Sequence, residues 1–224
     1  MKTNEELQKD VQNAIKWEPL LHAAEIGVSV KDGVVTLTGN VDSYTKKTEA
    51  ENATKNISGV KVVIEKIEVK FHSSFDKKDD NDVANEILNA YKWNWQVPND
   101  KVKVKVENGW VTLDGEVAWN YQKTAAKDAV SKLMGVTGVF NNITIKSESK
   151  DAIEKEDIEN ALKRNWSLNA EDINVKVHDH KVTLTGTVGS WYQKDEAARI
   201  AWSAAGVWEV HNELEIEYEY ELMD

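Results

Sequence analysis

One eight-residue pattern occurs three times in this chain, and it constrains the fold more than any other feature. The pattern reads x-V-T-L-x-G-x-V, and its copies are centred on Gly39, Gly115 and Gly186. These glycines are spaced at nearly equal intervals along the chain. The intervals exceed those of solenoid repeats, and each is long enough for a small domain of its own. The sequence therefore predicts three tandem units, although length alone would suggest one or two domains.

Other landmarks keep a similar spacing around each repeated glycine. A tryptophan precedes each glycine at nearly the same interval, and a Gly-Val pair follows each at the same interval. The tryptophans are Trp17, Trp93 and Trp166, and the pairs begin at Gly59, Gly135 and Gly206. The units are predicted at residues 3–72, 80–147 and 154–220. The connecting segments are short and polar and contain no proline, so relative motion of the units is expected.

Hydrophobic periodicity predicts the order of elements within a unit. Each unit opens with an apolar stripe at helical spacing and continues with a strand-like alternation, as in 102–106. Asp32-Gly33 and Asn108-Gly109 follow the alternation in the first two units, and such pairs are strong signals for a two-residue hairpin. Unit three has Asp179-His180 there, and histidine tolerates a positive φ less well than glycine.

A second helix and a third strand complete each unit. The helix is rich in alanine in units two and three, which lets it lie close to a sheet. The third strand is predicted at Val62–Val69, Val139–Ile145 and Val210–Tyr220. The predicted fold class is α+β: three α-β-β-α-β modules, each with two helices on one face of a three-stranded mixed sheet.

Composition and charge limit the classes of function. The chain is 41% hydrophobic and 30% charged, which is typical of a folded protein, and it has no cysteine for a disulfide framework. The net charge is −11, and residues 151–224 carry 7 Lys and Arg against 17 Asp and Glu. This acidity disfavours nucleic-acid binding and tight docking of the last third on anionic lipid.

No targeting or membrane-spanning segment is evident in the sequence. The first residues are polar and acidic and lack the apolar core of a secretory signal, and no apolar run approaches the length of a membrane span. The expected location is the cytoplasm, or the periplasm if a signal has been removed.

The repeated motif resembles that of the BON (bacterial OsmY and nodulation) domain family. The resemblance rests on G-x-V-T-L-x-G-x-V, a following aromatic, an alanine-rich helix, Gly-Val and V-x-N-x-I/L-x-I/V. The motif asparagine corresponds to Asn141 or Asn142 in unit two and to Asn212 in unit three, whereas unit one has Glu65. The match extends over nearly the whole chain, three times in register.

The resemblance implies a non-enzymatic binding protein. BON domains are α/β modules mostly of bacterial envelope or stress proteins, linked to phospholipid surfaces, osmotic stress, chaperone-like help in secretion or potassium sensing. We therefore expect weak binding of phospholipid surfaces or envelope partners through several modules. A chaperone-like scaffold and a potassium sensor remain alternatives. No cofactor or metal is expected, and no nucleophile motif, phosphate loop or metal-protease motif is present.

Aromatic residues after the second strand are the main candidates for binding, because tryptophan and tyrosine favour surfaces that are part apolar and part wet. These candidates are Trp119, Tyr121, Trp191 and Tyr192. A strand face with Lys101, Lys103 and Lys105 could meet phosphate groups, although such runs are more often simply solvated.

The remaining tryptophans and the repeated glycines have structural interpretations. Trp17, Trp93 and Trp166 are predicted to close the core of each unit. For Trp110, Trp202 and Trp208, partner contact and domain packing both stay open. Gly39, Gly115 and Gly186 are interpreted as structural glycines that relieve strain near a strand end. His178-Asp179-His180 is interpreted as a solvated turn, since no third metal ligand is visible.

Overall fold

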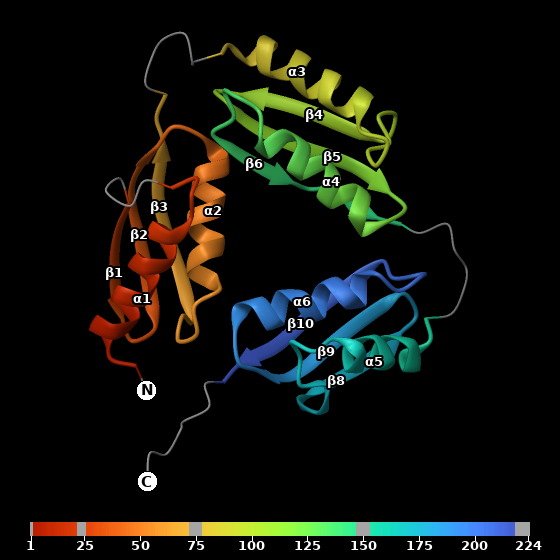
Figure 1. The fold of residues 1–224 in the computed structure, drawn as a ribbon. Coiled ribbons are helices and arrows are strands. Elements are labelled where there is room, and N and C mark those ends of the chain that lie inside the picture. The colour runs from red at the N-terminus through yellow and green to blue at the C-terminus, as the bar shows by residue number, and fades with distance from the viewer. Residues whose placement is uncertain (1, 22–25, 72–77, 147–152, 218–224) are drawn as a thin grey trace.

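The protein is described by a computed structural model that covers residues 2–21, 26–71, 78–146 and 153–217. It contains three units in the same order of helix, strand, strand, helix and strand (Figure 1). Unit one comprises α1 (Asn4–Trp17), β1 (Ile26–Lys31), β2 (Val34–Val41), α2 (Tyr44–Lys55) and β3 (Val62–Val69). Unit two comprises α3 (Asp80–Trp93), β4 (Val102–Glu107), β5 (Trp110–Val117), α4 (Asn120–Ser131), β6 (Gly138–Asn141) and β7 (Thr144–Ile145). Unit three comprises α5 (Lys155–Arg164), a 3₁₀ helix η2 (Ala170–Asp172), β8 (Ile173–His178), β9 (Lys181–Val188), α6 (Trp191–Trp202) and β10 (Glu209–Ile216).

The second strand of each unit lies in the middle of a mixed sheet. β1 pairs antiparallel with β2, and β3 pairs parallel with β2 on its other side. β4-β5-β6 and β8-β9-β10 repeat this order. The antiparallel neighbours are joined by a tight turn, and the parallel neighbours are joined through the second helix. The predicted α+β class, with three repeated modules, is confirmed.

The hairpin turns use left-handed backbone conformations. Asp32 and Asn108 have φ values of 53° and 54°, and the glycine that follows each of them also has a positive φ. Two consecutive residues with positive φ are typical of a type I′ turn, whose twist matches that of the strands. In the turn of unit three, Asp179 has a φ of 53°, whereas His180, which lacks the freedom of a glycine, has no positive φ.

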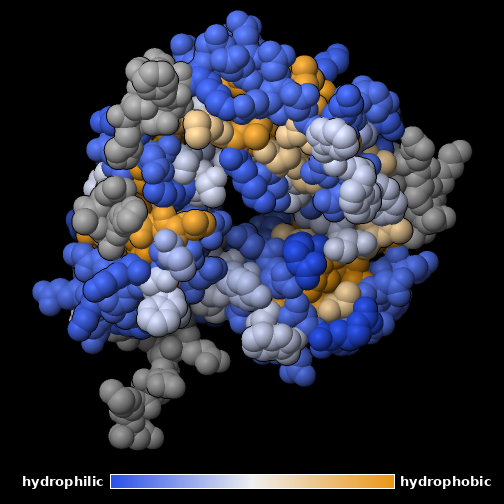
Figure 2. Space-filling model, turned by 45° about the horizontal axis from the view of Figure 1, so that its top comes forward, coloured by the Kyte–Doolittle hydropathy of each residue, from blue (hydrophilic) through white to orange (hydrophobic). Residues whose placement is uncertain are grey.

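Each unit has its own hydrophobic core between its sheet and its helices. In unit one, α1 packs on β1 and α2, and α2 packs on β2 and β3. Alanines on the second helices lie against the sheets with almost no exposed surface, as the alanine-rich sequence predicts. These alanines are Ala50, Ala126, Ala197 and Ala201. Figure 1 shows the three units around a common centre, with α2, α4 and α6 on the inner side. Figure 2 shows an opening between the units and a predominantly hydrophilic outer surface.

The prediction that Trp17, Trp93 and Trp166 close the cores is wrong. All three side chains are almost fully exposed. The cores are closed at this end by smaller residues, Leu21 in unit one and Val97 in unit two, both buried.

The motif asparagine ties the third strand to the second helix. Asn141 Nδ2 donates to the carbonyl oxygen of Lys123 at 3.1 Å, and Asn212 Nδ2 donates to that of Lys194 at 2.7 Å. In unit one, Glu65 occupies this position and forms an ion pair with Lys47 at 2.8 Å. The structure thus selects Asn141 rather than Asn142 as the motif residue.

The third strand of unit two is interrupted, although the sequence predicts one strand over Val139–Ile145. It divides into β6 and β7, and Asn142 between them still donates its backbone N–H to the Leu113 carbonyl at 2.8 Å. The prediction for unit three extends to Tyr220, whose last residues lie outside the described part of the chain.

Candidate functional site

Three highly exposed tryptophans occupy the same place in the three units, at or just after the end of the first helix. The exposed fraction is 89% for Trp17, 85% for Trp93 and 95% for Trp166. α1 and α3 end at their tryptophan, and α5 ends two residues before Trp166. We call these three residues the tryptophan triad. Their indoles are available for contact with a ligand outside the unit.

Helix geometry explains why the triad points outward. α1 buries Leu7, Val11 and Ile15, which are four residues apart and form one stripe. Trp17 lies two residues beyond Ile15, which is about 200° around the helix from that stripe. Trp93 has the same relation to the buried Tyr91. The spacing from the last stripe residue, rather than hydrophobicity, was the signal in the sequence that would have predicted this exposure.

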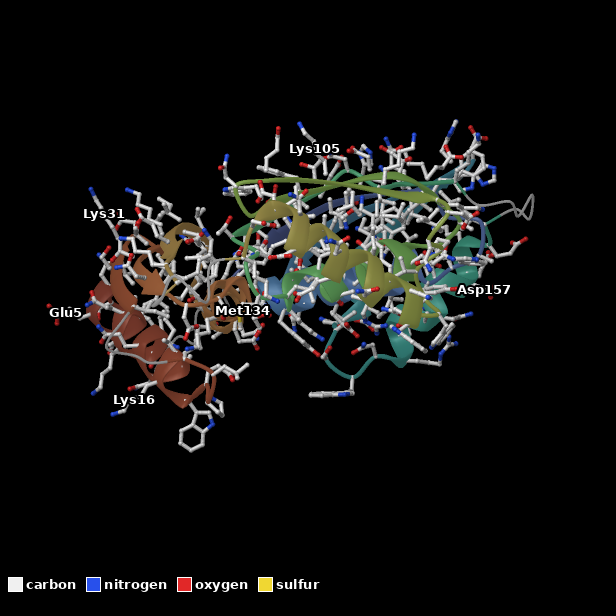
Figure 3. All side chains as sticks on the ribbon, turned by 90° about the horizontal axis from the view of Figure 1, so that it is seen from above. Glu5, Lys16, Lys31, Lys105, Met134 and Asp157 are labelled. Atoms are coloured by element: carbon white, nitrogen blue, oxygen red, sulfur yellow. The ribbon has the colours of Figure 1, made fainter. Side chains whose placement is uncertain are left out.

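Basic residues accompany each member of the triad. Lys16 lies in the last turn of α1, Lys92 in that of α3, and Lys163 and Arg164 in that of α5. The first helices of the units descend toward one side of the molecule in Figure 3, the side on which Lys16 is labelled. The structure therefore presents three similar Trp-and-cation ends on one side.

The structure places the predicted aromatic residues after the second strand in different surroundings. Trp119 and Tyr121 stand at the start of α4 and are 36% and 47% exposed, whereas Tyr192 in α6 is 48% exposed. Trp191 packs against the core of unit one, and its Nε1 donates to the Lys61 carbonyl at 3.1 Å. Trp191 therefore forms a contact between units three and one.

The predicted lysine face is the solvent-exposed side of β4 and of the residue that precedes it in unit two. Lys101, Lys103 and Lys105 are exposed, and Lys105 forms an ion pair with Glu107 at 2.9 Å. Lys105 points toward the side opposite Lys16 in Figure 3. One flat surface therefore cannot contact this lysine face and the triad side together.

Two of the three repeated glycines lie where the neighbouring backbone leaves no room for a side chain. Gly39, Gly115 and Gly186 have φ values of 132°, 144° and 119°. A Cβ on Gly115 would lie 2.1 Å from the Lys101 carbonyl oxygen, and one on Gly186 would lie 1.9 Å from that of Asp172. These glycines allow the first strand to approach the second closely, which is a structural role.

No metal-binding cluster of His, Cys, Asp and Glu is present in the described part of the chain. His178 lies beside Asp179 at 3.2 Å on the surface, and His180 stacks on Trp208 with ring centroids 3.8 Å apart.

A cavity of about 1190 Å³ lies between units one and three. Side chains of both charges line it, including Lys2, Lys61, Asp32 and Asp172. Within the described ranges, no helix is long and apolar enough to cross a membrane.

Comparison with known proteins identifies the repeated unit. The model of the BON domain matches residues 3–70, 79–147 and 150–218, which together are most of the chain. This chain belongs to the BON domain family. The three BON units of the structure correspond to these matched segments, and the motif residues Gly115 and Asn141 thereby have defined structural roles in a BON unit.

One curated relative is "Osmotically-inducible protein Y" of Escherichia coli (strain K12). It is 30% identical over 129 residues, which are 56% of this chain and 64% of that protein. The alignment therefore spans less than two thirds of the relative's length.

Two solved structures of CdsD, a structural protein of the type III secretion system of Chlamydia trachomatis, also match. They cover 95% and 97% of this chain and 93% and 100% of theirs, each at 16% identity and a TM-score of 0.25. At that TM-score the likeness says nothing about how the BON units are arranged here.

Proposed function

We propose that this BON protein is a non-enzymatic, stress-related binding protein that attaches weakly to anionic phospholipid surfaces through the tryptophan triad. The observation that carries the proposal is the equivalent exposure of Trp17, Trp93 and Trp166, at 85% or more in each unit. A large apolar side chain kept in water at the same place in three units favours a role outside the unit core. The name of the osmotically inducible relative supports the link to osmotic stress.

The chemistry of each triad end fits a bilayer interface. Tryptophan prefers the headgroup region, where its ring meets apolar matter and its N–H meets water. The neighbouring Lys16, Lys92 and Arg164 supply cations, each worth about 1 kcal/mol near an anionic membrane surface. Any single end would bind weakly, and three ends on one side would together bind more tightly than one, because the second and third contacts form within a molecule that is already attached.

Because the protein is acidic overall, only its triad side would attach to an anionic membrane. The net charge of −11 opposes a general attraction to anionic lipid. Binding must therefore come from the local cations and indoles of the triad side. Lys105 points away from that side in Figure 3, and Lys103 shares its face of β4, so neither would contribute to the same attachment.

Vesicle co-sedimentation tests this proposal. The probe is a vesicle of phosphatidylglycerol and phosphatidylethanolamine, compared with pure phosphatidylcholine. The variant combines Trp17→Ala, Trp93→Ala and Trp166→Ala, and we expect its partition coefficient to fall at least tenfold, which corresponds to about 1.4 kcal/mol. Because the three side chains are almost fully exposed, the folding stability of this variant should change little.

A matched control removes exposed aromatics elsewhere. Trp110 and Phe140 are 43% and 54% exposed and stack at 4.9 Å, in the sheet of unit two. Their replacement by alanine should leave vesicle binding unchanged. Equal binding by the triad variant and the parent would reject the membrane proposal. The parent protein could instead fail to bind vesicles and suppress aggregation of a client protein in a way that depends on the triad. That result would replace the membrane proposal with the chaperone-like scaffold.

A further inference from the structure

The contact between units one and two is made by the start of α2. Tyr44, the first residue of α2, packs against the core of unit two. Burial raises the pKa of Tyr44, while a hydrogen bond with the Val139 backbone acts in the opposite direction. Thr45 Oγ1 donates to the carbonyl of Ser131, the last residue of α4, at 3.0 Å. The start of one second helix thus meets the end of the next.

The contact between units three and one repeats this arrangement. Trp191, the first residue of α6, packs against the core of unit one and donates to the Lys61 carbonyl at 3.1 Å. Lys55, the last residue of α2, places its Nζ 5.9 Å from the centre of the Trp191 ring. The donor position is again the first residue of a second helix. The last residue of the next second helix lies at both contacts, as Ser131 and Lys55. The backbone partner differs, since it is Val139 within β6 for Tyr44 and Lys61, the residue before β3, for Trp191.

Strand register identifies the same positions at the junction of units two and three. Val34 pairs with Val62, and Lys181 pairs with Glu209 at the equivalent place, so Trp208 corresponds to Lys61. The last residue of α6 is Trp202, which corresponds to Lys55. The donor position, the first residue of α4, is Asn120. At this junction the aromatic rings therefore belong to the receiving unit, and the donor is small and polar.

Trp208 has the features expected of a residue that contacts a neighbouring unit. It is half-buried and stacks on His180. Its Nε1 is the one buried side-chain nitrogen or oxygen without a hydrogen-bond partner in the described residues. In Figure 1 the start of α4 faces the end of α6.

We propose that Asn120 docks against Trp202 and Trp208, and that this third contact closes the three BON units into an intramolecular ring. The ring follows the order one to two, two to three and three to one, with α2, α4 and α6 arranged head to tail. The partner of the Trp202 and Trp208 surface is thus unit two of the same chain. This proposal is independent of lipid binding.

Distances between spin labels test the ring directly, because the chain has no cysteine of its own. Ser29, Lys105 and Lys176 are exposed and stand at equivalent positions of β1, β4 and β8. Their replacement by cysteine in pairs gives one distance for each pair of units. Dilution with unlabelled protein restricts the measurement to one chain. The parent should give three narrow distance distributions.

Two variants on opposite sides of the contact should broaden one of these distributions. Trp208→Lys introduces the residue found in unit one, and Asn120→Glu places a carboxylate where a helix start favours it but the indoles would have to desolvate it. Both should at least double the width of the distribution between units two and three and leave the other two narrow. Trp95→Lys, at a tryptophan that is 85% exposed, is the matched control.

Either of two results would overturn the proposal. One is a broad distribution between units two and three in the parent, and the other is no change in its width with Asn120→Glu. If Trp208→Lys unfolds unit three, as judged by hydrogen exchange, the result with Asn120→Glu decides alone. Because this experiment does not measure vesicle binding, a failure of the lipid-binding proposal would leave the ring proposal unaffected.

Discussion

Replacement of Gly186 by alanine should destabilise unit three far more than replacement of its neighbour Gly189. Gly186 lies in β9, the central strand, paired with Ile173 on one side and Leu214 on the other. Its φ is +119°, and an added Cβ would lie 1.9 Å from the Asp172 carbonyl oxygen. The first strand cannot remain in register without moving away from this atom.

The magnitude follows from two contributions. A left-handed backbone at a residue with a side chain costs about 1–3 kcal/mol, and overpacking against a fixed neighbour costs about 1–3 kcal/mol more. A folded unit of about 70 residues has a free energy of unfolding of roughly 4–10 kcal/mol. A loss near 3 kcal/mol would lower the Tm of a unit of this size by about 12–24 °C.

Gly189→Ala is the matched control in the same unit. A Cβ at Gly189 would meet a single neighbouring atom, the side-chain Oε1 of Gln193 at 3.2 Å, which can move. Its effect should stay below about 1 kcal/mol. Calorimetry would give the transition, and hydrogen exchange of peptides from β8 and β9 would assign it to unit three. Equal Tm values for Gly186→Ala and Gly189→Ala would refute the structural role of the repeated glycine.

Two further predictions concern unit two. Tyr91 donates its hydroxyl to the Ala126 carbonyl at 3.0 Å, and burial raises its pKa, so its stabilisation is complete below about pH 10 and is lost as the pH rises further. Urea unfolding of Tyr91→Phe should show a loss of about 1 kcal/mol at neutral pH and a weaker decline above pH 10, and an unchanged alkaline decline would contradict this. The Asp80 carboxylate accepts the backbone N–H groups of Asn108 and Gly109 at 2.7 and 2.9 Å. Asp80→Ala should cost about 1–2 kcal/mol and speed hydrogen exchange in this hairpin, whereas unchanged exchange rates would show that water replaces the carboxylate fully.

Features that depend on local sequence were predictable. The positions of helices and strands follow from apolar spacing, because a residue three or four positions away shares a helix face and a residue two positions away shares a strand face. The turn at Asp32-Gly33 was predictable because few residue pairs adopt two positive φ values. The exposure of Trp17 was predictable from the same spacing rule, but tryptophan's hydrophobicity favoured the opposite prediction.

The roles of the other aromatics depended on contacts between distant parts of the chain. Trp191 and Tyr192 are neighbours in sequence, yet Trp191 packs on unit one, 130 residues from its acceptor Lys61, and Tyr192 is half-exposed. Periodicity cannot distinguish them, because each unit's own core is complete without either residue. The sequence by itself determined three BON units and the order of helices and strands within each, since those follow from residue spacing within a single unit. Only the tertiary structure decided which aromatic side chains join the units and which point to solvent, because that depends on which surfaces of separate units meet.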